Sequence, residues 1–314
     1  MNIFFKKICA FLIVGIVAAY SLQWIIDTGL KKSGYSVDYN EWYEIMHSKI
    51  NAEIIIQGSS TARIQISPEY LEQQFKLSAY NMGISGATFP FELYKFNEYI
   101  KLNKKPRYII QVIDANTLTH AIDVDFVQFI PYLNYDLVNK FRNHILFTEK
   151  DLYIPLFKYS HRIGAVTAGL DHLFDKNVQS IGTYKGFQTY NGHYNKSLID
   201  KMLKNSTKGF FAPFNDTIYR QFIHFADYCK KRKISLIMVY APAQADFQKK
   251  LLNNDSVANW YRKIAKRYDF KFFDYSNNLL SRDTSMYLDY FHLNNKGVKL
   301  FNEALVKDLK TVIK

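Results

Sequence analysis

The chain has 314 residues, and its content of 48% hydrophobic and 17% aromatic residues excludes a disordered protein and is sufficient for a large folded core. Lysine and arginine number 41 against 28 acidic residues, which gives a formal net charge of +13. This charge suits an anionic membrane or an anionic glycopolymer as a partner, or else it comes from solvated lysine-rich helix faces. Nucleic acid is not expected as a partner, because the chain carries no nucleic-acid recognition motif.

The first thirty residues differ from the rest of the chain. Lys6 and Lys7 precede an apolar run from Ile8 to Ile26. At about 1.5 Å per residue, a helix of this length crosses a hydrocarbon core about 30 Å thick. We therefore predict a transmembrane anchor at residues 1–29 and a single-pass protein of the cytoplasmic membrane, with its domain at 30–314 outside the cytoplasm. A cleaved signal peptide and a buried helix of a soluble protein are the alternatives.

Beyond the anchor, short apolar runs alternate with segments of helical periodicity. The predicted strands are Ala52–Gln57, Ala79–Met82, Tyr108–Ile113, Ser235–Tyr240 and Phe270–Asp274. The predicted helices are Pro68–Phe75, Pro90–Leu102, Asp216–Lys231, Val257–Tyr268 and Asn295–Lys310, the last capped by Asn294. This alternation predicts an α/β fold with a central parallel sheet, whose strands are buried on both faces.

The alternation stops between about residues 118 and 214, a stretch too long for an ordinary loop. We predict an insertion or cap subdomain there that helps to build the substrate site. Its aromatic residues serve either the core of the cap or the stacking of sugar rings. Five of the eight histidines lie in or beside it, at His120, His144, His161, His172 and His193. They lack metal-ligand spacing, so we expect neither a metal nor another cofactor.

Two short motifs contain the elements of a serine nucleophile system. Gly58, Ser59 and Ser60 follow the first predicted strand, while Asp289 and His292 lie three residues apart after the last one. The carboxyl ends of parallel strands meet at one edge of a sheet, so we expect these side chains to lie close together. A serine, an imidazole and a carboxylate then suffice for nucleophilic catalysis. A structural turn and a cap on the final helix are the alternative explanations.

The order and positions of these motifs resemble the sequence blocks of the SGNH (GDSL-like) hydrolase superfamily, over roughly residues 50–116 and 215–314. The resemblance implies a three-layer α/β/α fold of the SGNH and flavodoxin-like type. It also implies that Ser60 is the nucleophile, with Ser59 in place of the family's aspartate. His292 corresponds to the general base, and Asp289 to the residue that orients it.

The same resemblance implies an oxyanion hole made by the backbone N–H groups of Ser60 and Gly83. The third block departs from the family pattern, because Asp114 and Asn116 stand where Gly-x-Asn-Asp is expected. Asn116 is its only candidate side-chain donor, and Asp114 is either a turn residue or a site residue. Arg63 either contacts an anionic substrate or lies on a helix surface, and we expect the surface position.

The Gly-Ser-Ser form, the anchor and the insertion are more similar to membrane-anchored SGNH-like proteins of cell-envelope modification. Examples are the D-alanyl transfer protein of teichoic acid systems and the alginate acetylation proteins. This similarity implies an extracytoplasmic serine O-acyltransferase or esterase that acts on cell-envelope glycans or glycolipids, with an acyl group supplied by a multi-span membrane acyltransferase. The alternative is a non-catalytic SGNH-fold component that binds a glycan or serves as a scaffold in an envelope acylation system.

Overall fold

The computed structural model describes residues 2–32, 37–119, 124, 126–142, 147–174, 183–194 and 208–314. The chain divides into two compact units. Residues 1–44 and 125–181 form the first, here called the helical unit, and residues 45–124 and 182–314 form the second, the sheet unit. The predicted insertion is thus divided, because its end, from residue 182 on, belongs to the unit that contains the sheet. His120 and His144 lie outside the described residues.

The sheet unit is built on five parallel strands in the order β2-β1-β3-β6-β7. They are β1 (Ile54–Gln57), β2 (Ala79–Asn81), β3 (Tyr108–Ile113), β6 (Ser235–Tyr240) and β7 (Lys271–Asp274). All five predicted strands are confirmed, with ends that shift by two residues at most. Every residue of β1, β2 and β3 is buried, which is why these strands read as unbroken runs without polar alternation. This strand order is that of the flavodoxin-like doubly wound sheet.

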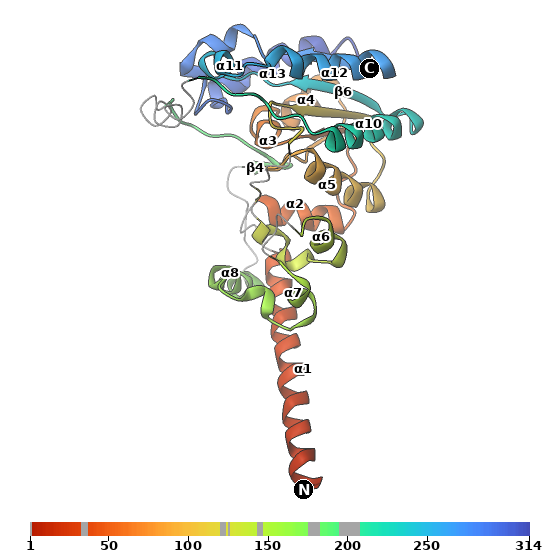
Figure 1. The fold of residues 1–314 in the computed structure, drawn as a ribbon, viewed down its shortest axis with the longest axis vertical. Helices are drawn as coiled ribbons and strands as arrows, with labels where there is room; N and C mark the ends of the chain where they lie inside the picture. Colours follow the sequence, from red (N-terminus) through yellow and green to blue (C-terminus); the bar gives the residue numbers. More distant parts are fainter. Residues whose placement is uncertain are drawn as a thin grey trace. The chain divides into compact units, whose positions relative to one another are not determined.

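Helices cover both faces of this sheet, which confirms the three-layer arrangement (Figure 1). The helices α3 (Ser60–Gln65), α4 (Pro68–Phe75) and α13 (Asn295–Leu309) pack in one core with residues of β1, β3 and β6. In a second group, α10 (Asp216–Lys231) contacts α5 (Phe89–Leu102) and α12 (Asn254–Tyr268), and both α10 and α12 contact the sheet. Asn294 caps α13 as predicted, since its Oδ1 accepts from the N–H groups of Lys296 and Gly297 at 3.1 Å each.

Smaller elements complete the sheet unit. They are the hairpin β4 (Thr183–Tyr184) and β5 (Phe187–Gln188), the helix α11 (Ala245–Lys250), and the 3-10 helices η4 (Leu279–Arg282) and η5 (Thr284–Met286). The two 3-10 helices lie between β7 and the segment that contains Asp289 and His292. That segment is therefore a separate loop after β7 and before α13, and its position depends on tertiary contacts.

The helical unit contains α1 (Asn2–Lys32), η1 (Phe126–Tyr132), α6 (Tyr135–Lys140), α7 (Glu149–Tyr153), η2 (Phe157–Tyr159) and α8 (Ile163–Phe174), together with most of α2 (Val37–Met46). The C-terminal part of α1 packs against α8 (Figure 1). A Cβ atom on Gly29 would lie 1.6 Å from the carbonyl oxygen of Gly169, so this helix pair requires glycine at the crossing. By length and composition α1 can cross a membrane, although a signal sequence would meet the same criteria.

Candidate active site

Ser60 is held at the carboxyl edge of the sheet by the turn that follows β1. Gly58 has a φ angle of 150°, and a Cβ atom there would lie 2.8 Å from the carbonyl oxygen of Val112. Only glycine permits this close approach of two neighbouring strand ends. Ser59 then caps α3, because its Oγ accepts from the N–H of Thr61. As a result Ser60 is the first residue of α3, half-buried, at the position predicted for a nucleophile.

The structure brings His292 and Asp289 to this serine. His292 Nε2 lies 2.7 Å from Ser60 Oγ, and His292 Nδ1 lies 2.7 Å from Asp289 Oδ2. The side-chain amide of Gln65, on α3, also donates to the carbonyl oxygen of Phe291 and so ties the two segments together. A hydroxyl, an imidazole and a carboxylate in this chain of contacts form the geometry of a nucleophile, its general base and the residue that orients the base.

The loop that carries His292 is folded around the carboxylate of Asp289. The Oδ1 atom of Asp289 accepts from the backbone N–H groups of Phe291 at 2.8 Å and of His292 at 2.9 Å, and the N–H of Leu288 donates to the carbonyl oxygen of His292 at 2.8 Å. Burial acts to raise the pKa of the Asp289 carboxyl, but the hydrogen bond and the electrostatic attraction from the His292 ring and the two backbone donors together lower the pKa below its usual value. Asp289 is therefore held as a carboxylate.

The second serine of the turn has a different partner. Ser59 is buried, and its Oγ donates to Asp114 Oδ2 at 2.7 Å and lies 3.0 Å from Thr61 Oγ1. Asp114 in turn accepts from the N–H of Asn116 at 2.7 Å through its other oxygen. Asp114 follows β3, which pairs with β1, so the carboxylate reaches the turn from the neighbouring strand. The sequence allows Asp114 to be either a turn residue or a site residue. Because position 59 is a serine and not an acid, a carboxylate from another segment could bind there, and Asp114 supplies it.

Gly83 lies against the start of α3, but its N–H already has an acceptor. A Cβ atom at Gly83 would lie 2.5 Å from the backbone nitrogen of Arg63, so glycine is required by this packing. The N–H of Gly83 donates to Asn81 Oδ1 at 2.9 Å. Asn81 is itself fixed, because its Nδ2 donates to the carbonyl oxygens of Ala62 at 2.8 Å and Ile66 at 2.9 Å. The predicted second oxyanion donor is thus engaged within the protein.

Two other predicted donors are available. Among the described residues, neither the N–H of Ser60 nor the side chain of Asn116 has a hydrogen-bond partner. Asn116 is exposed and is joined to the serine turn through its contact with Asp114. The N–H of Ser60 can donate to an anionic oxygen that forms next to Ser60 Oγ.

Arg63 is buried, so the expected position on a helix surface is wrong. The physical reason is that α3 is enclosed by its neighbours, and every residue from Thr61 to Gln65 is buried. The short helix contacts β1, β3, β5 and α13, which leaves it no solvent face of its own for Arg63.

The end of the predicted insertion lies beside the loop that carries His292. The ring of Tyr194 lies 6.3 Å from that of Tyr290, and the side chain of Asn294 donates to the carbonyl oxygen of Gly192 at 3.2 Å. A small cavity of about 20 Å³ is lined by Thr61, Asp114, Ala115, Phe247 and Phe291, among other residues. A cavity of that size holds about one water molecule, so the residues that line it are closely packed around Asp114.

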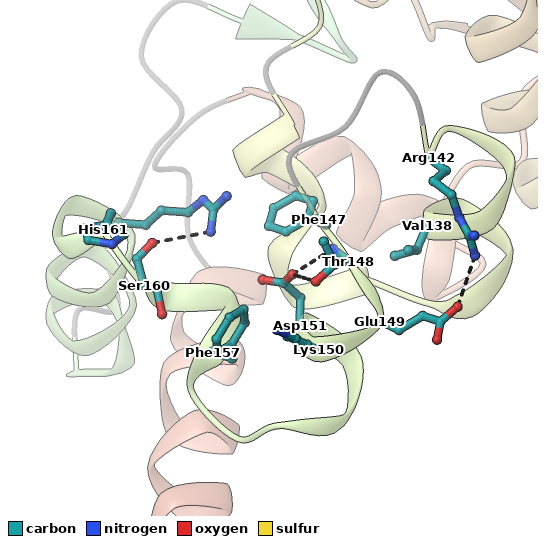
Figure 2. Close-up of a pocket in the computed structure, with 11 residues that line it drawn as sticks. Val138, Arg142, Phe147, Thr148, Glu149, Lys150, Asp151, Phe157, Ser160 and His161 are labelled. Atoms are coloured by element: carbon teal, nitrogen blue, oxygen red, sulfur yellow. Dashed lines mark hydrogen bonds and ion pairs between the residues drawn. The ribbon is translucent and has the colours of Figure 1, made fainter.

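A much larger cavity, of about 1110 Å³, lies in the helical unit (Figure 2). It is lined by residues of α6, α7 and η2 and includes an ion pair between Arg142 and Glu149 at 3.0 Å. Lys150 and Arg162 also line it. Within the part of the chain that the structure describes, no group of three or more His, Cys, Asp or Glu side chains is placed to hold a metal ion.

Comparisons with known proteins give remote structural likenesses. No family model matches the chain, and no curated protein is similar to it. The chain is similar to a structure described as a GDSL-like lipase from Bacteroides thetaiotaomicron, at 11% identity and a TM-score of 0.41, with 88% of this chain and 99% of that chain covered. It is also similar to one described as an acylhydrolase from Bacteroides fragilis, at 10% identity and a TM-score of 0.40, with 83% and 88% covered.

A third similar structure, described as a lipolytic protein of the G-D-S-L family from Desulfitobacterium hafniense, is 12% identical, with a TM-score of 0.38 and coverage of 82% of this chain and 99% of that chain.

Proposed function

We propose that the chain is a serine acyl-transfer enzyme of the SGNH type, an O-acyltransferase or esterase. The observation that carries this proposal is the pair of 2.7 Å contacts from His292, one to Ser60 Oγ and one to Asp289 Oδ2. These residues come from opposite ends of the chain, and a purely structural histidine has no need of both partners. The buried Asn294 caps α13, so capping of that helix does not account for Asp289 and His292.

The geometry supports a two-step reaction. His292 Nε2 takes the proton of Ser60 as Oγ attacks an ester carbonyl, while Asp289 holds the imidazole in the tautomer that leaves Nε2 free to accept. The tetrahedral oxyanion accepts hydrogen bonds from the N–H of Ser60 and the side chain of Asn116. The tetrahedral intermediate then expels the alkoxide, which receives the proton from His292, and an acyl-serine remains.

The acceptor decides the second step. A water molecule or a sugar hydroxyl attacks the acyl-serine, gives its proton to His292, and Ser60 is released as the leaving group.

We propose that the acceptor is a glycan or glycolipid of the cell envelope. Support comes from α1, which can anchor the chain in the cytoplasmic membrane with the sheet unit outside, and from the net charge of +13, which suits an anionic polymer. A multi-span membrane acyltransferase would supply the acyl group.

The second candidate is a non-catalytic SGNH-fold component of an envelope acylation system that binds a glycan or acts as a scaffold. One observation favours it: the N–H of Gly83, the predicted second backbone donor, is engaged by Asn81. An oxyanion at Ser60 would then have fewer donors than a complete oxyanion hole provides.

The deciding experiment is covalent trapping in the full-length chain. A fluorophosphonate probe is expected to add to the peptide that contains Ser60, as measured by mass spectrometry, and aryl acetate is expected to be hydrolysed. The matched control is Ser59→Ala, one residue earlier, which leaves the reactive hydroxyl in place. Labelling that persists unchanged in Ser60→Ala would refute the enzymatic role and leave the non-catalytic candidate.

A further inference from the structure

We call residues 149–174 of the helical unit the collar. Three successive polar contacts join the collar to the C-terminal half of α1. The hydroxyl of Tyr20 donates to the carbonyl oxygen of Tyr153 at 2.7 Å. The N–H of Leu156 donates to Gln23 Oε1 at 2.6 Å. Lys158 Nζ then lies 2.8 Å from Asp27 Oδ2. These α1 residues follow one another at about one helical turn, so the collar runs along α1 in register.

These contacts give polar partners to three side chains of α1, those of Tyr20, Gln23 and Asp27. Two further polar side chains in this stretch bond within the helix: Ser21 Oγ donates to the carbonyl oxygen of Val17 at 2.8 Å, and Thr28 Oγ1 to that of Trp24 at 2.7 Å. The hydroxyl of Tyr159 also donates to Asp27. Internal satisfaction of polar groups is what a bilayer demands, because lipid tails offer no partners. A helix standing in water would not need the collar for this purpose.

The contacts with α1 determine how deep the collar would lie in a membrane that α1 crosses. The apolar run of α1 extends from Ile8 to Ile26, and Tyr20 is six residues before its end. At 1.5 Å per residue that position lies about 9 Å inside the apolar boundary, if α1 crosses the membrane along its axis. The backbone of Tyr153 is bonded to Tyr20, so this part of the collar lies at a similar depth.

Several large apolar side chains of the collar are exposed and do not pack on α1. Tyr153, Ile154 and Phe157 are exposed in the α7 to η2 connection. On α8, Ile163 is 75% exposed and Leu170 36% exposed. Ile163 and Leu170 are seven residues apart and share one helix face, whereas the opposite face packs on α1 through the buried Ala165, Ala168 and Gly169. Such a cluster of exposed large side chains is unfavourable in water and favourable at a lipid surface.

Basic side chains lie beside this apolar surface, as is usual for segments that rest in a membrane interface. Arg142, Lys150 and Arg162 line the cavity shown in Figure 2, together with Phe157 and the acidic Glu149 and Asp151. The guanidinium of Arg162 lies 4.5 Å from the ring centre of Phe147, so its charge is held against the aromatic side chain.

We propose that the collar lies in the outer leaflet of the membrane beside α1, with Tyr153, Ile154, Phe157, Ile163 and Leu170 in contact with lipid at the boundary between acyl chains and head groups. The partner of this surface is the bilayer itself. The proposal rests on the proposed membrane insertion of α1, and it adds a second membrane contact to a chain whose sequence shows only one.

Site-specific labelling of the full-length chain in phospholipid vesicles tests the proposal. Single cysteines at Ile163→Cys and Ile154→Cys, made in a Cys9→Ser background, carry an environment-sensitive fluorophore. Cys229 can remain, because it is buried and burial raises the pKa of its thiol. The vesicles contain phosphatidylcholine and phosphatidylglycerol, with or without a lipid that carries a nitroxide quencher on its acyl chain.

Two controls make the result specific. Leu279→Cys is a matched control, because Leu279 is 79% exposed, as Ile163 is 75% exposed, but belongs to η4 of the sheet unit. Val14→Cys, in the exposed apolar part of α1, reports whether α1 itself is inserted. We expect the nitroxide lipid to quench positions 14, 154 and 163 severalfold more strongly than position 279, and aqueous iodide to show the reverse order.

Failure of this proposal and failure of membrane insertion give different results. If position 14 is quenched by lipid while 154 and 163 behave like 279, α1 is inserted and the collar proposal is wrong. If position 14 also behaves like 279, both the insertion and the collar are refuted.

Discussion

The hydroxyl of Ser59 donates to Asp114 Oδ2 at 2.7 Å, and this contact separates two adjacent serines by role. Ser59 caps α3 and is bound by a carboxylate from the end of β3, while Ser60 faces His292 Nε2. A serine that donates to a half-buried carboxylate and caps a helix is a poor nucleophile, because a carboxylate is a weak base and no imidazole is placed to take its proton. The neighbouring serine has that base.

The first prediction separates these two serines by their effect on turnover. Ser60→Ala is expected to lower kcat for aryl acetate by about 10⁴-fold or more, as removal of a nucleophile does in other serine enzymes. Ser59→Ala is expected to retain measurable turnover. Steady-state kinetics of the purified full-length protein checks both, and equal losses in the two variants would contradict the assignment of Ser60.

The second prediction concerns Asp289→Asn. The amide oxygen of asparagine can still accept from the N–H groups of Phe291 and His292, so the loop should keep its fold. The amide cannot stabilise the imidazolium and favours the wrong tautomer of His292, and kcat is expected to fall by about 10⁴-fold. The control is the melting temperature, which should change little. Turnover at the wild-type rate would show that Asp289 does not orient the base.

The third prediction treats Asp114 as a positioning residue that acts through Ser59. Asp114→Asn weakens the bond to Ser59 Oγ, and we expect about a tenfold fall in kcat with little change in KM. Ser59→Ala removes the same contact from the other side. If the two act through one bond, the double variant should be no worse than the poorer single variant. Additive losses in this cycle would indicate separate roles.

The fourth prediction tests the oxyanion donors. Asn116→Ala is expected to lower kcat by about 10²-fold to 10³-fold with KM nearly unchanged, because the donor acts on charge that develops only in the transition state. Asn295→Ala, an exposed asparagine at the start of α13, is the matched control. An unchanged kcat in Asn116→Ala would refute a role for Asn116 as an oxyanion donor and would leave the N–H of Ser60 as the donor.

The fifth prediction concerns how the free energy of unfolding depends on pH through the buried carboxyl group of Glu92. Glu92, on α5, accepts from Gln111 Nε2 at 2.7 Å. Burial raises the pKa of Glu92 well above its usual value, the nearby charge of Asp114 acts in the same direction, and the hydrogen bond from Gln111 opposes the shift only in part. The folded state therefore holds a proton that the unfolded state releases.

A raised carboxyl pKa in the folded state makes the free energy of unfolding largest below the unfolded pKa of about 4.3 and lowers it as the pH rises. Glu92→Gln is neutral at every pH and keeps an oxygen acceptor for Gln111. We expect this variant to be more stable than the wild type at pH 8, by about 1 kcal/mol or more, with a difference that shrinks toward pH 5. Thermal unfolding at the two pH values measures this, and a difference that is independent of pH would contradict it.

Much of the sheet unit could be predicted from local patterns. The strands Tyr108–Ile113 and Ser235–Tyr240 are predicted at their observed ends, because a strand buried on both faces is dominated by apolar residues. Helices such as Pro68–Phe75 and Asp216–Lys231 were equally clear, since proline, capping side chains and apolar spacing are local signals. Arg63 was misplaced because the burial of α3 depends on elements distant in sequence, including α13.

The sequence by itself determined the parallel α/β pattern, the apolar helix at the amino terminus and the identity of the residues that could form a serine nucleophile system. Those properties follow from periodicity and residue type, which depend only on residues that are close in the sequence. Only the tertiary structure decided that Ser60 meets His292, that Ser59 is bound by Asp114 and that Asn81 engages the N–H of Gly83. Each of these contacts joins different segments, and its geometry exists only once the strand order and the loop before α13 are fixed by packing.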